Sequence, residues 1–484
     1  MDLASLSPAI ALTPLDGRYR AAVAPLVDCL SEAALNRARL IVEIEWLIHL
    51  SDAAALPGAP ALTAADKEYL RAIPEDFGAE EIAELAEIEA ETRHDVKAVE
   101  YFLKRRLARA AESLPGSALP QMGEIVHIFC TSEDVNNLSY ALIVRDAVQR
   151  VWLPAAYRLV TDLADMARAH RAVPMLSRTH GQPATPTTVG KELAVTTYRL
   201  SRQLRRIAAT EYLGKINGAT GTYGAHTISV PGTDWPRICR NFVEHLGLTF
   251  TPLTTQIEAH DWQAELYSDV ARFNRIAHNL ATDVWSYISL GYFRQNLAAQ
   301  GSTGSSTMPH KVNPIRFENA EANMEISCAL LDTLSATLVT SRMQRDLTDS
   351  TTQRNIGPAF GHSLLAIDNI VRGLAGLDVD PQPLEADLDA AWEVLGEAVQ
   401  QAMRAASIAG ATGMEDPYER LKELTRGRKV DAAAMRDFIG SLGMPDDVAT
   451  RLLELTPAGY IGLADTLVDE LDDLVPSWDE LSQN

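Results

Sequence analysis

The sequence predicts an all-α protein of three helical domains, of which the central one is a bundle of long helices. Apolar residues recur at helical spacing over long stretches, for example at Leu266, Val270, Phe273 and Leu280. Strand-like alternation of apolar and polar residues is almost absent. Long helical periods joined by short connections are typical of a helix bundle.

Changes in this pattern along the chain predict the domain limits. An irregular arm precedes the first helical stripe, which contains Leu35, Arg39, Val42 and Trp46. Proline-bearing breaks separate the helices that follow, and the linker-like sequence LDVDPQP precedes a series of shorter helices. We therefore expect an N-terminal helical domain at 1–120, the central long-helix bundle at 121–374 and a C-terminal helical domain at 375–484.

The composition limits the kinds of partner. The 484 residues carry a formal net charge of −22, which argues against nucleic acid or an anionic membrane surface as the main partner. We find no run of about eighteen apolar residues and no secretory signal, so we expect a cytoplasmic protein without a membrane segment. The acidic tail after residue 467 is expected to be solvated.

The usual cofactor motifs are absent from the sequence. The four cysteines are far apart, without a CxxC pair, and are expected to be reduced thiols. His127 and Cys130 are close in sequence, but their spacing is more typical of core packing than of a metal site. Neither a GxGxxG motif nor a P-loop is present.

The stretch GSTGSSTMPHKVNPIRFENAEAN, residues 301–323, is the richest in chemistry. Its glycines and hydroxyl residues predict a loop, and Asn313 and Pro314 are suited to the N-cap and first position of the following helix. Lys311 lies beside that helix start, where unpaired N–H groups and the helix dipole attract anions. The alternative is a surface loop with an ordinary helix cap.

The segment SRTHGQPATP, residues 177–186, places His180 in a tight polar loop. Thr185 and Pro186 are predicted to be the N-cap and first residue of the next helix. A histidine titrates near neutral pH, so it can give or take a proton in catalysis. The alternative is a surface histidine that only makes hydrogen bonds.

Two segments match the capping-box pattern [ST]xx[DE], TRHD at 92–95 and TSED at 131–134. In the simpler interpretation each segment only starts a helix. In the functional interpretation His94 and Ser132 also lie at helix N-termini, where anions bind.

Other candidates for ligand contacts are polar residues in loops. Arg345 and Arg354 can bind phosphate or carboxylate through two N–H groups each, although pairing with the aspartates between them is an equal alternative. Gln256 precedes a long helix, and Arg18 and Tyr19 follow an Asp-Gly turn. The alternative for Gln256 is a local hydrogen bond to the backbone. The alternative for Arg18 and Tyr19 is an anchor for the N-terminal arm.

Taken together, these segments resemble the fumarase/aspartase superfamily, and within it the adenylosuccinate lyase family in its longer bacterial form. GSSTMPHKVNP is similar to the superfamily signature GSSxMPxKxNP, while TSED, RTHGQPATP, RDLTDS and KELTRG resemble this one family. The resemblance runs from LDGRY at Leu15 to PYERLKELTRGRKVD near the C-terminus. It departs at Ala259, where the family commonly has proline, and at Arg93, where it often has asparagine.

The resemblance implies an activity and an assembly. The fold would be fumarase/aspartase-like, with the long helices of four chains forming one tetrameric core. The reaction would be β-elimination of fumarate from adenylosuccinate, giving AMP, and from the succinylaminoimidazole carboxamide ribotide (SAICAR), giving AICAR, in purine nucleotide biosynthesis on the routes to AMP and IMP. No metal or organic cofactor is implied, and each site would be shared between subunits of a homotetramer. The alternatives are another fumarate-releasing lyase, such as argininosuccinate lyase, and a catalytically silent helical homologue.

The resemblance also implies roles for single residues. Ser305 would be the general base and His180 the general acid, with Lys311 and His94 assisting catalysis. The implied substrate contacts are Arg18, Tyr19, Arg93, His94, Asp95, Thr131, Ser132, Gln256, Lys311, Asn313, Arg345, Ser350 and Arg354.

Overall fold

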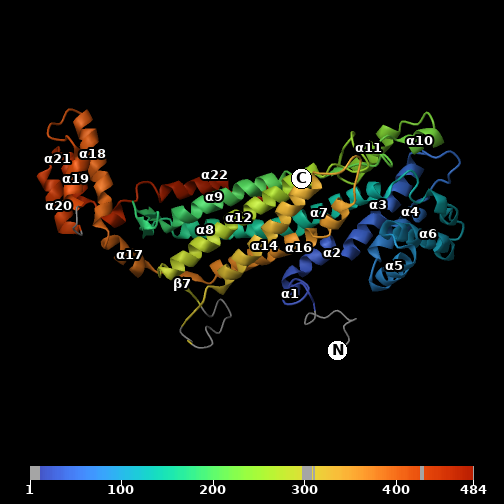
Figure 1. The fold of residues 1–484 in the computed structure, drawn as a ribbon, viewed down its shortest axis with the longest axis horizontal. Helices are drawn as coiled ribbons and strands as arrows, with labels where there is room; N and C mark the ends of the chain where they lie inside the picture. The colour runs from blue at the N-terminus through green and yellow to red at the C-terminus, as the bar shows by residue number, and fades with distance from the viewer. Residues whose placement is uncertain (1–10, 297–307, 309–310, 426–429, 483–484) are drawn as a thin grey trace.

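The computed structural model describes residues 11–296, 308, 311–425 and 430–482. A long bundle of helices runs through the middle of the molecule, with a group of helices at each end (Figure 1). Helices dominate the described residues, and each described strand has only two or three residues. The predicted all-α class is confirmed.

The helices divide by position along the chain. The first group is α1 (Arg20–Val23), α2 (Val27–Leu30), α3 (Glu32–Asp52), α4 (Ala64–Glu75), α5 (Ala79–Thr92) and α6 (Asp95–Ser113), with the 3-10 turns η1 (Ala24–Leu26), η2 (Leu119–Gln121) and η3 (Gly123–Ile125). The central group is α7 (Ser132–Ala147), the π-helical turn η4 (Val148–Trp152), α8 (Leu153–Ala169), α9 (Val189–Ala208), α10 (Gly224–Ser229), α11 (Trp235–His245), α12 (Asp261–Ser289), α14 (Ile315–Leu338), α15 (Thr348–Gln353) and α16 (Ile356–Leu374). The last group is α17 (Pro381–Asp389), η5 (Trp392–Leu395), α18 (Gly396–Ile408), α19 (Pro417–Thr425), α20 (Ala432–Ser441), α21 (Asp446–Glu454), η6 (Pro457–Gly459), η7 (Thr466–Glu470), α22 (Leu471–Leu474) and α23 (Trp478–Ser482).

The short strands pair two by two and join segments at the edges of the bundle. The antiparallel pairs are β1 (Pro174–Met175) with β4 (Thr187–Thr188), β2 (Arg178–Thr179) with β3 (Gln182–Pro183), and β7 (Phe293–Gln295) with β8 (Leu377–Val379). The parallel pair is β5 (Leu213–Gly214) with β6 (Thr249–Phe250).

Five long helices form the bundle. In the order α8, α9, α12, α14 and α16, each contacts the next, and α16 closes the ring against α8 (Figure 1). Their inward residues are apolar and buried, among them Leu200 of α9, Phe273 of α12 and Leu331 of α14. Because apolar residues recur every three to four positions, each helix buries one face against two neighbours.

A chain of buried hydrogen bonds crosses this apolar core. Trp152 Nε1 donates to Ser363 Oγ (2.8 Å), which donates to Asn274 Oδ1 (2.7 Å). Asn274 Nδ2 donates to Ser327 Oγ (3.0 Å), which donates to the Ala359 carbonyl oxygen (2.7 Å). Because these polar groups are paired with one another, this series of hydrogen bonds specifies how η4, α12, α14 and α16 align.

Separate apolar clusters lie at the two ends of the chain's central bundle. Leu47, Leu70 and Phe102 belong to a cluster that α3, α4, α5 and α6 share. Val399 and Met435 belong to another, formed by the helices after α17. The domain limits given above stay predictions. No helix in the described part of the chain is both long and apolar enough to cross a membrane.

The expectation of a solvated tail after residue 467 is wrong. Val468 and Leu471 are buried in the main core, and α22 and α23 lie against α9. Two acidic residues of the tail pair with arginines at the end of α8, Asp469 with Arg171 (2.7 Å) and Asp472 with Arg168 (2.9 Å). The acidic composition of the tail concealed apolar residues at helical spacing.

His226 of α10 is a buried histidine surrounded by aromatic rings. The ring centroids of Phe129, Trp235 and Tyr223 lie at 4.8, 5.0 and 5.5 Å. Neither ring nitrogen has a hydrogen-bond partner within the described structure.

Burial therefore lowers the pKa of His226 to about 4. In the unfolded chain the pKa of histidine is about 6.5. The unfolded state thus binds more protons as the pH falls from about 6.5 to about 4, and the folded state loses stability over that window.

We expect His226→Phe to reduce this acid sensitivity. Phenylalanine keeps the aromatic contacts and removes two unpaired buried nitrogens. The free energy of unfolding, measured by urea titration, should fall by about 1–2 kcal/mol less in the variant than in the wild type between about pH 7.5 and about pH 5. An unchanged pH dependence would show that His226 already binds a proton in the folded state.

Candidate active site

The N-terminus of α7 is fixed by one buried carboxylate, that of Asp134. It accepts hydrogen bonds from the backbone N–H groups of Thr131 (2.9 Å), Asn217 (3.0 Å) and Gly218 (3.1 Å). It also pairs with Lys215 Nζ at 2.8 Å, and both side chains are fully buried. The predicted acidic half of the TSED capping box is therefore confirmed. In addition, Asp134 ties residues 215–218 to the start of α7.

A second group of predicted residues meets on the side of α7 that carries Glu133. Arg345 Nη2 lies 3.1 Å from Glu133 Oε2, and Arg345 Nη1 donates to Gln256 Oε1 at 3.4 Å. Gln256 Nε2 in turn donates to the Ala219 carbonyl oxygen (3.1 Å). The Ser350 N–H donates to the carboxylate of the residue before it. The structure thus brings Gln256, Arg345 and Ser350 to α7.

Arg345 pairs with Asp349 (3.7 Å), one of the aspartates that follow it, but this pair does not lie on a solvated face. The Arg345 side chain is only 16% exposed, and Asp349 is buried. Burial raises the pKa of Glu133 to about 7, although the charges of His260 and Arg345 act in the opposite direction. At neutral pH the Glu133 carboxyl group beside Arg345 is therefore only partly ionised.

A third group lies on the other side of α7, around the buried guanidinium of Arg39. Arg39 Nε donates to Asn136 Oδ1 of α7 (2.9 Å), and Arg39 Nη2 pairs with Asp95 Oδ2 (2.7 Å). The predicted residue Arg354 joins the same carboxylate at 3.4 Å and pairs with Glu32 at 2.7 Å. Burial opposes ionisation of Asp95, but Arg39 and a backbone N–H outweigh it, so the pKa of Asp95 is lowered.

Sequence reasoning missed the role of Arg39. The available signal was an arginine on an otherwise apolar helical stripe, since a buried charge requires partners. Those partners, Asp95 and Asn136, are 56 and 97 residues away in the chain. No local pattern reveals contacts of that range.

His94 is the N-cap of α6, and the predicted TRHD capping box is wrong. α5 continues through Thr92, whose hydroxyl donates to the Ile88 carbonyl oxygen (3.0 Å). Arg93 ends α5 in the left-handed region (φ 53°), and both Arg93 and His94 are exposed. His94 Nδ1 accepts from the Lys97 N–H (3.2 Å), so the neutral ring carries its proton on Nε2.

The predicted contacts in the N-terminal arm have structural partners. The Tyr19 hydroxyl accepts from Asn319 Nδ2 of α14 (3.1 Å) and its ring packs beside Leu15 and Leu365. This agrees with an anchor for the arm. Arg18, next to it, is exposed.

His180 forms the tip of the β2–β3 hairpin and is exposed. His180 and Gly181 both have positive φ (54° and 75°), as a two-residue turn between twisted strands requires. Arg178 of the hairpin donates to Tyr292 Oη (2.7 Å) and pairs with Asp387 of α17. The predicted tight loop is confirmed. The predicted helix start at Thr185 is wrong, because β4 intervenes and Thr188 caps α9.

The segment that carries Lys311 and Asn313 follows β7. Gln295 Nε2 donates to the Val312 carbonyl oxygen (2.8 Å), and Lys311 is exposed. α14 begins at Ile315 with Pro314 as its N-cap, one residue later than predicted. Ser305, the predicted base, lies outside the described residues.

Within one chain the predicted residues form separate groups. The hairpin of His180 is tied to α17, near one end of the bundle, whereas α6 and its N-cap His94 lie toward the other end (Figure 1). One chain therefore does not bring His180 to the residues around α7.

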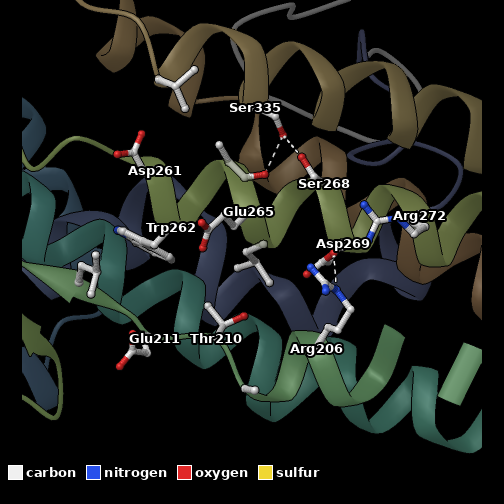
Figure 2. A pocket seen from close by; sticks show the side chains of 15 residues that line it. Arg206, Thr210, Glu211, Asp261, Trp262, Glu265, Ser268, Asp269, Arg272 and Ser335 are labelled. Carbon is white, nitrogen blue, oxygen red and sulfur yellow. Dashed lines mark hydrogen bonds and ion pairs between the residues drawn. The ribbon is translucent and has the colours of Figure 1, made fainter. Parts of the chain in front are cut away.

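A large open cavity of about 950 Å³ lies elsewhere, between α9, α12 and α14. Figure 2 shows Asp269 between the two arginines that line it, Arg206 (3.0 Å) and Arg272 (2.7 Å). None of the described residues predicted for the site lines it. A smaller cavity of about 440 Å³ does border the site, because residues on both sides of Gln256 line it.

One group of described side chains has the chemistry of a metal site. Glu133, His260 and Asp349 are buried, and their potential ligand atoms all lie within 4.8 Å of one another. Arg345, however, already lies 3.1 Å from Glu133 and 3.7 Å from Asp349. A cation at this position would have to displace the guanidinium.

Known families and relatives match nearly the whole chain. Residues 17–328 match the family model described as Lyase, and residues 341–461 match the one described as Adenylosuccinate lyase C-terminal. Adenylosuccinate lyase of Escherichia coli K12 is 48% identical over 471 residues, which are 97% of this chain and 100% of the relative. Adenylosuccinate lyase of Vibrio cholerae is 46% identical, over 96% of this chain and 100% of the relative.

Two solved structures share the fold. Fumarate lyase from Mesorhizobium sp. BNC1 superposes with a TM-score of 0.72 at 18% identity, covering 95% of this chain and 98% of that one. The 3-carboxy-cis,cis-muconate lactonizing enzyme from Pseudomonas putida gives 0.70 at 20% identity, covering 93% and 96%. Fold and family model together define the class as an all-α lyase. More narrowly, the chain belongs to the adenylosuccinate lyase family.

We expect Lys215→Met to destabilise the protein strongly. The substitution leaves the fully buried Asp134 carboxylate without its cation, and breaking a buried pair costs about 3–5 kcal/mol. Urea unfolding at a fixed protein concentration measures this loss. Lys67→Met, which removes a cation from the exposed pair with Asp52, is the matched control and should cost less than about 1 kcal/mol. Equal losses in the two variants would contradict the structural role of Lys215.

Proposed function

We propose that this chain catalyses β-elimination of fumarate from adenylosuccinate, giving AMP, and from SAICAR, giving AICAR, in purine nucleotide biosynthesis. The observation that carries the proposal is the 48% identity to a protein named adenylosuccinate lyase over 97% of this chain. The proposal includes a cytoplasmic location and requires neither a metal nor an organic cofactor.

The reaction sets a clear physical problem. A C–H bond beside a carboxylate is a very weak acid, and removing its proton adds a third negative charge to a succinyl arm with two carboxylates. The site therefore needs a base, cations or N–H donors directed at that charge, and an acid for the departing nitrogen. Ser305 is proposed as the base and His180 as the acid. Lys311 and Asn313 are proposed to hold a carboxylate.

The groups around α7 are proposed to bind the nucleotide part. The first N–H groups of a helix have no backbone partner within it, so the start of α7 at Ser132 is proposed to bind an anion, with Thr131 beside it. Arg345 and Gln256 approach the same end from one side and Arg354 from the other. His94 presents an Nε2–H donor at the start of α6. Arg18, Tyr19, Arg93, Asp95 and Ser350 complete the proposed substrate contacts.

We further propose a homotetramer whose sites are shared between subunits. The support is the separation of His180 from the α7 groups within one chain (Figure 1). Exposed apolar side chains on the outside of the bundle also support a tetramer. They include Val195 and Tyr198 of α9, Trp285 of α12 and Ile326 of α14. Long helices with exposed apolar faces are stable where other copies cover those faces.

The activity is tested by fumarate release from a panel of substrates. We expect release from adenylosuccinate and SAICAR, and none from argininosuccinate, aspartate or malate. Release from argininosuccinate alone would assign a different lyase activity. No release from any of the five would indicate a silent homologue.

The shared site is tested by mixing two inactive variants. Because each removes a general acid or base, Ser305→Ala and His180→Gln should each lower kcat by about 10²–10⁴-fold. When subunits assort at random, about a quarter of the sites in an equal mixture combine an intact His180 with an intact Ser305 from another chain. Activity should therefore return to roughly that fraction of wild type. Each variant mixed with itself is the control, and no recovery despite proven subunit exchange would place both residues in one chain.

A further inference from the structure

A buried polar cluster lies directly behind the proposed nucleotide contacts. It consists of Glu133 of α7, His260 at the start of α12 and Asp349 of α15, each less than one-tenth exposed. His260 Nε2 lies 3.4 Å from Asp349 Oδ2, and the potential ligand atoms of the three side chains lie within 4.8 Å of one another. Three distant parts of the chain therefore meet in this Glu–His–Asp cluster.

The proposed substrate contacts are attached to the cluster. Arg345 lies 3.1 Å from Glu133 and 3.7 Å from Asp349, and it donates to Gln256. The Ser350 N–H donates to Asp349 Oδ1 (2.6 Å). A shift of the cluster would consequently move Arg345, Gln256 and Ser350 together.

The cluster has more carboxyl groups than cationic groups unless His260 is protonated. Arg345 is permanently charged, whereas Glu133, Asp349 and Glu258 are all buried carboxyl groups. Glu258 Oε2 accepts a hydrogen bond from the His260 backbone N–H (3.0 Å), so the Glu258 carboxyl group also lies beside His260. An imidazolium at His260 would give Asp349 a cationic partner other than Arg345. The guanidinium then has N–H groups left for an anionic substrate.

Unpaired atoms in the cluster are consistent with an additional proton on His260. Arg345 Nε, His260 Nδ1 and Glu133 Oε1 are buried without a hydrogen-bond partner in the described structure. Buried polar atoms are normally paired, so a group that lacks a partner indicates a further ligand or a further proton. Among the described residues, Arg345 Nε has only the long ion-pair contact with Asp349 Oδ2 (3.7 Å), so the side chain is not tightly bound to Asp349.

We propose that His260 is a positioning residue: as an imidazolium held by Asp349 and Glu133, it keeps Arg345 and Gln256 placed and available for the anionic substrate. This inference rests on the proposed function. It names a residue that does not touch the reacting atoms and acts through Arg345.

The titration of the cluster supports the same charge state. Burial acts to lower the pKa of His260, but the hydrogen bond with Asp349 and the charges of Glu133 and Glu258 outweigh it, so that the pKa is raised. Glu133, with its pKa near 7, also faces Arg345, Asp349 and the more distant Lys215. As the pH rises, His260 loses its proton and Glu133 becomes ionised. Both changes add negative charge around Arg345, so substrate binding is expected to weaken with rising pH.

The test is the steady-state kinetics of His260→Asn in the full-length enzyme. His260 has φ 60°, a conformation that asparagine tolerates better than most residues, so the variant removes the charge with little added backbone strain. We expect KM for adenylosuccinate to rise about tenfold or more, because a hydrogen bond to a charged group is weakened, while kcat changes by less than about threefold. The wild-type KM should increase with pH, and that increase should be much smaller in the variant. His226→Phe, a change at another buried histidine, is the matched control and should keep the wild-type KM.

Each outcome is decisive. An unchanged KM, or equal pH dependence of KM in His260→Asn and wild type, would overturn the inference while leaving the proposed function intact. No fumarate release by the wild type would instead overturn the function, and the inference with it. If His260→Asn does not fold, His260→Gln also removes the imidazolium charge and should raise KM in the same way. Stoichiometric metal in the purified protein, lost with the activity on chelation, would show that the cluster holds a cation and would overturn the inference.

Discussion

The structure depends on the buried Asp134 carboxylate at the start of α7. A charge this deep requires full compensation, and Asp134 obtains it from Lys215 and three backbone N–H groups. Those donors come from the cap of α7 and from the segment after β5, so that one residue aligns two parts of the chain. Both Glu133 and Asn136, which hold the flanking arginines, lie within a turn of it on α7. The position of Asp134 therefore sets the geometry of every group around that helix end.

The sequence allowed the fold class to be predicted because helical periodicity is a local property that repeats over many turns. The same locality explains the errors. TRHD satisfies the capping-box pattern, yet α5 extends through Thr92. A pattern of four residues does not record where the preceding helix ends. Resemblance pointed to Gln256 and Arg345, but not to Arg39 or His260. A buried polar residue is recognised by its partners, and these partners are far away in the sequence.

The net charge of −22 and an anionic substrate are compatible only if the site balances its charges locally. The arginines around α7 are not a free cationic patch. Arg345 is shared by Glu133 and Asp349, and Arg354 by Glu32 and Asp95. An arriving anion competes with these carboxylates, so the protonation of their neighbours controls how much positive potential it meets. The raised pKa of Glu133 is one such control within the structure.

Backbone strain falls on three other residues named for the proposed site or its support. Left-handed conformations are rare for residues other than glycine, yet Arg93, His180 and His260 all adopt one. Each costs about 1 kcal/mol or more and persists only where surrounding contacts impose it. For His180 these contacts are the strands of the hairpin and the anchor of Arg178, and for His260 they are Asp349 and Glu258. An extended backbone at these positions would direct the three side chains elsewhere. The strained conformation is therefore what gives each side chain its orientation. The contacts that impose it therefore support the proposed site even where they never touch a ligand.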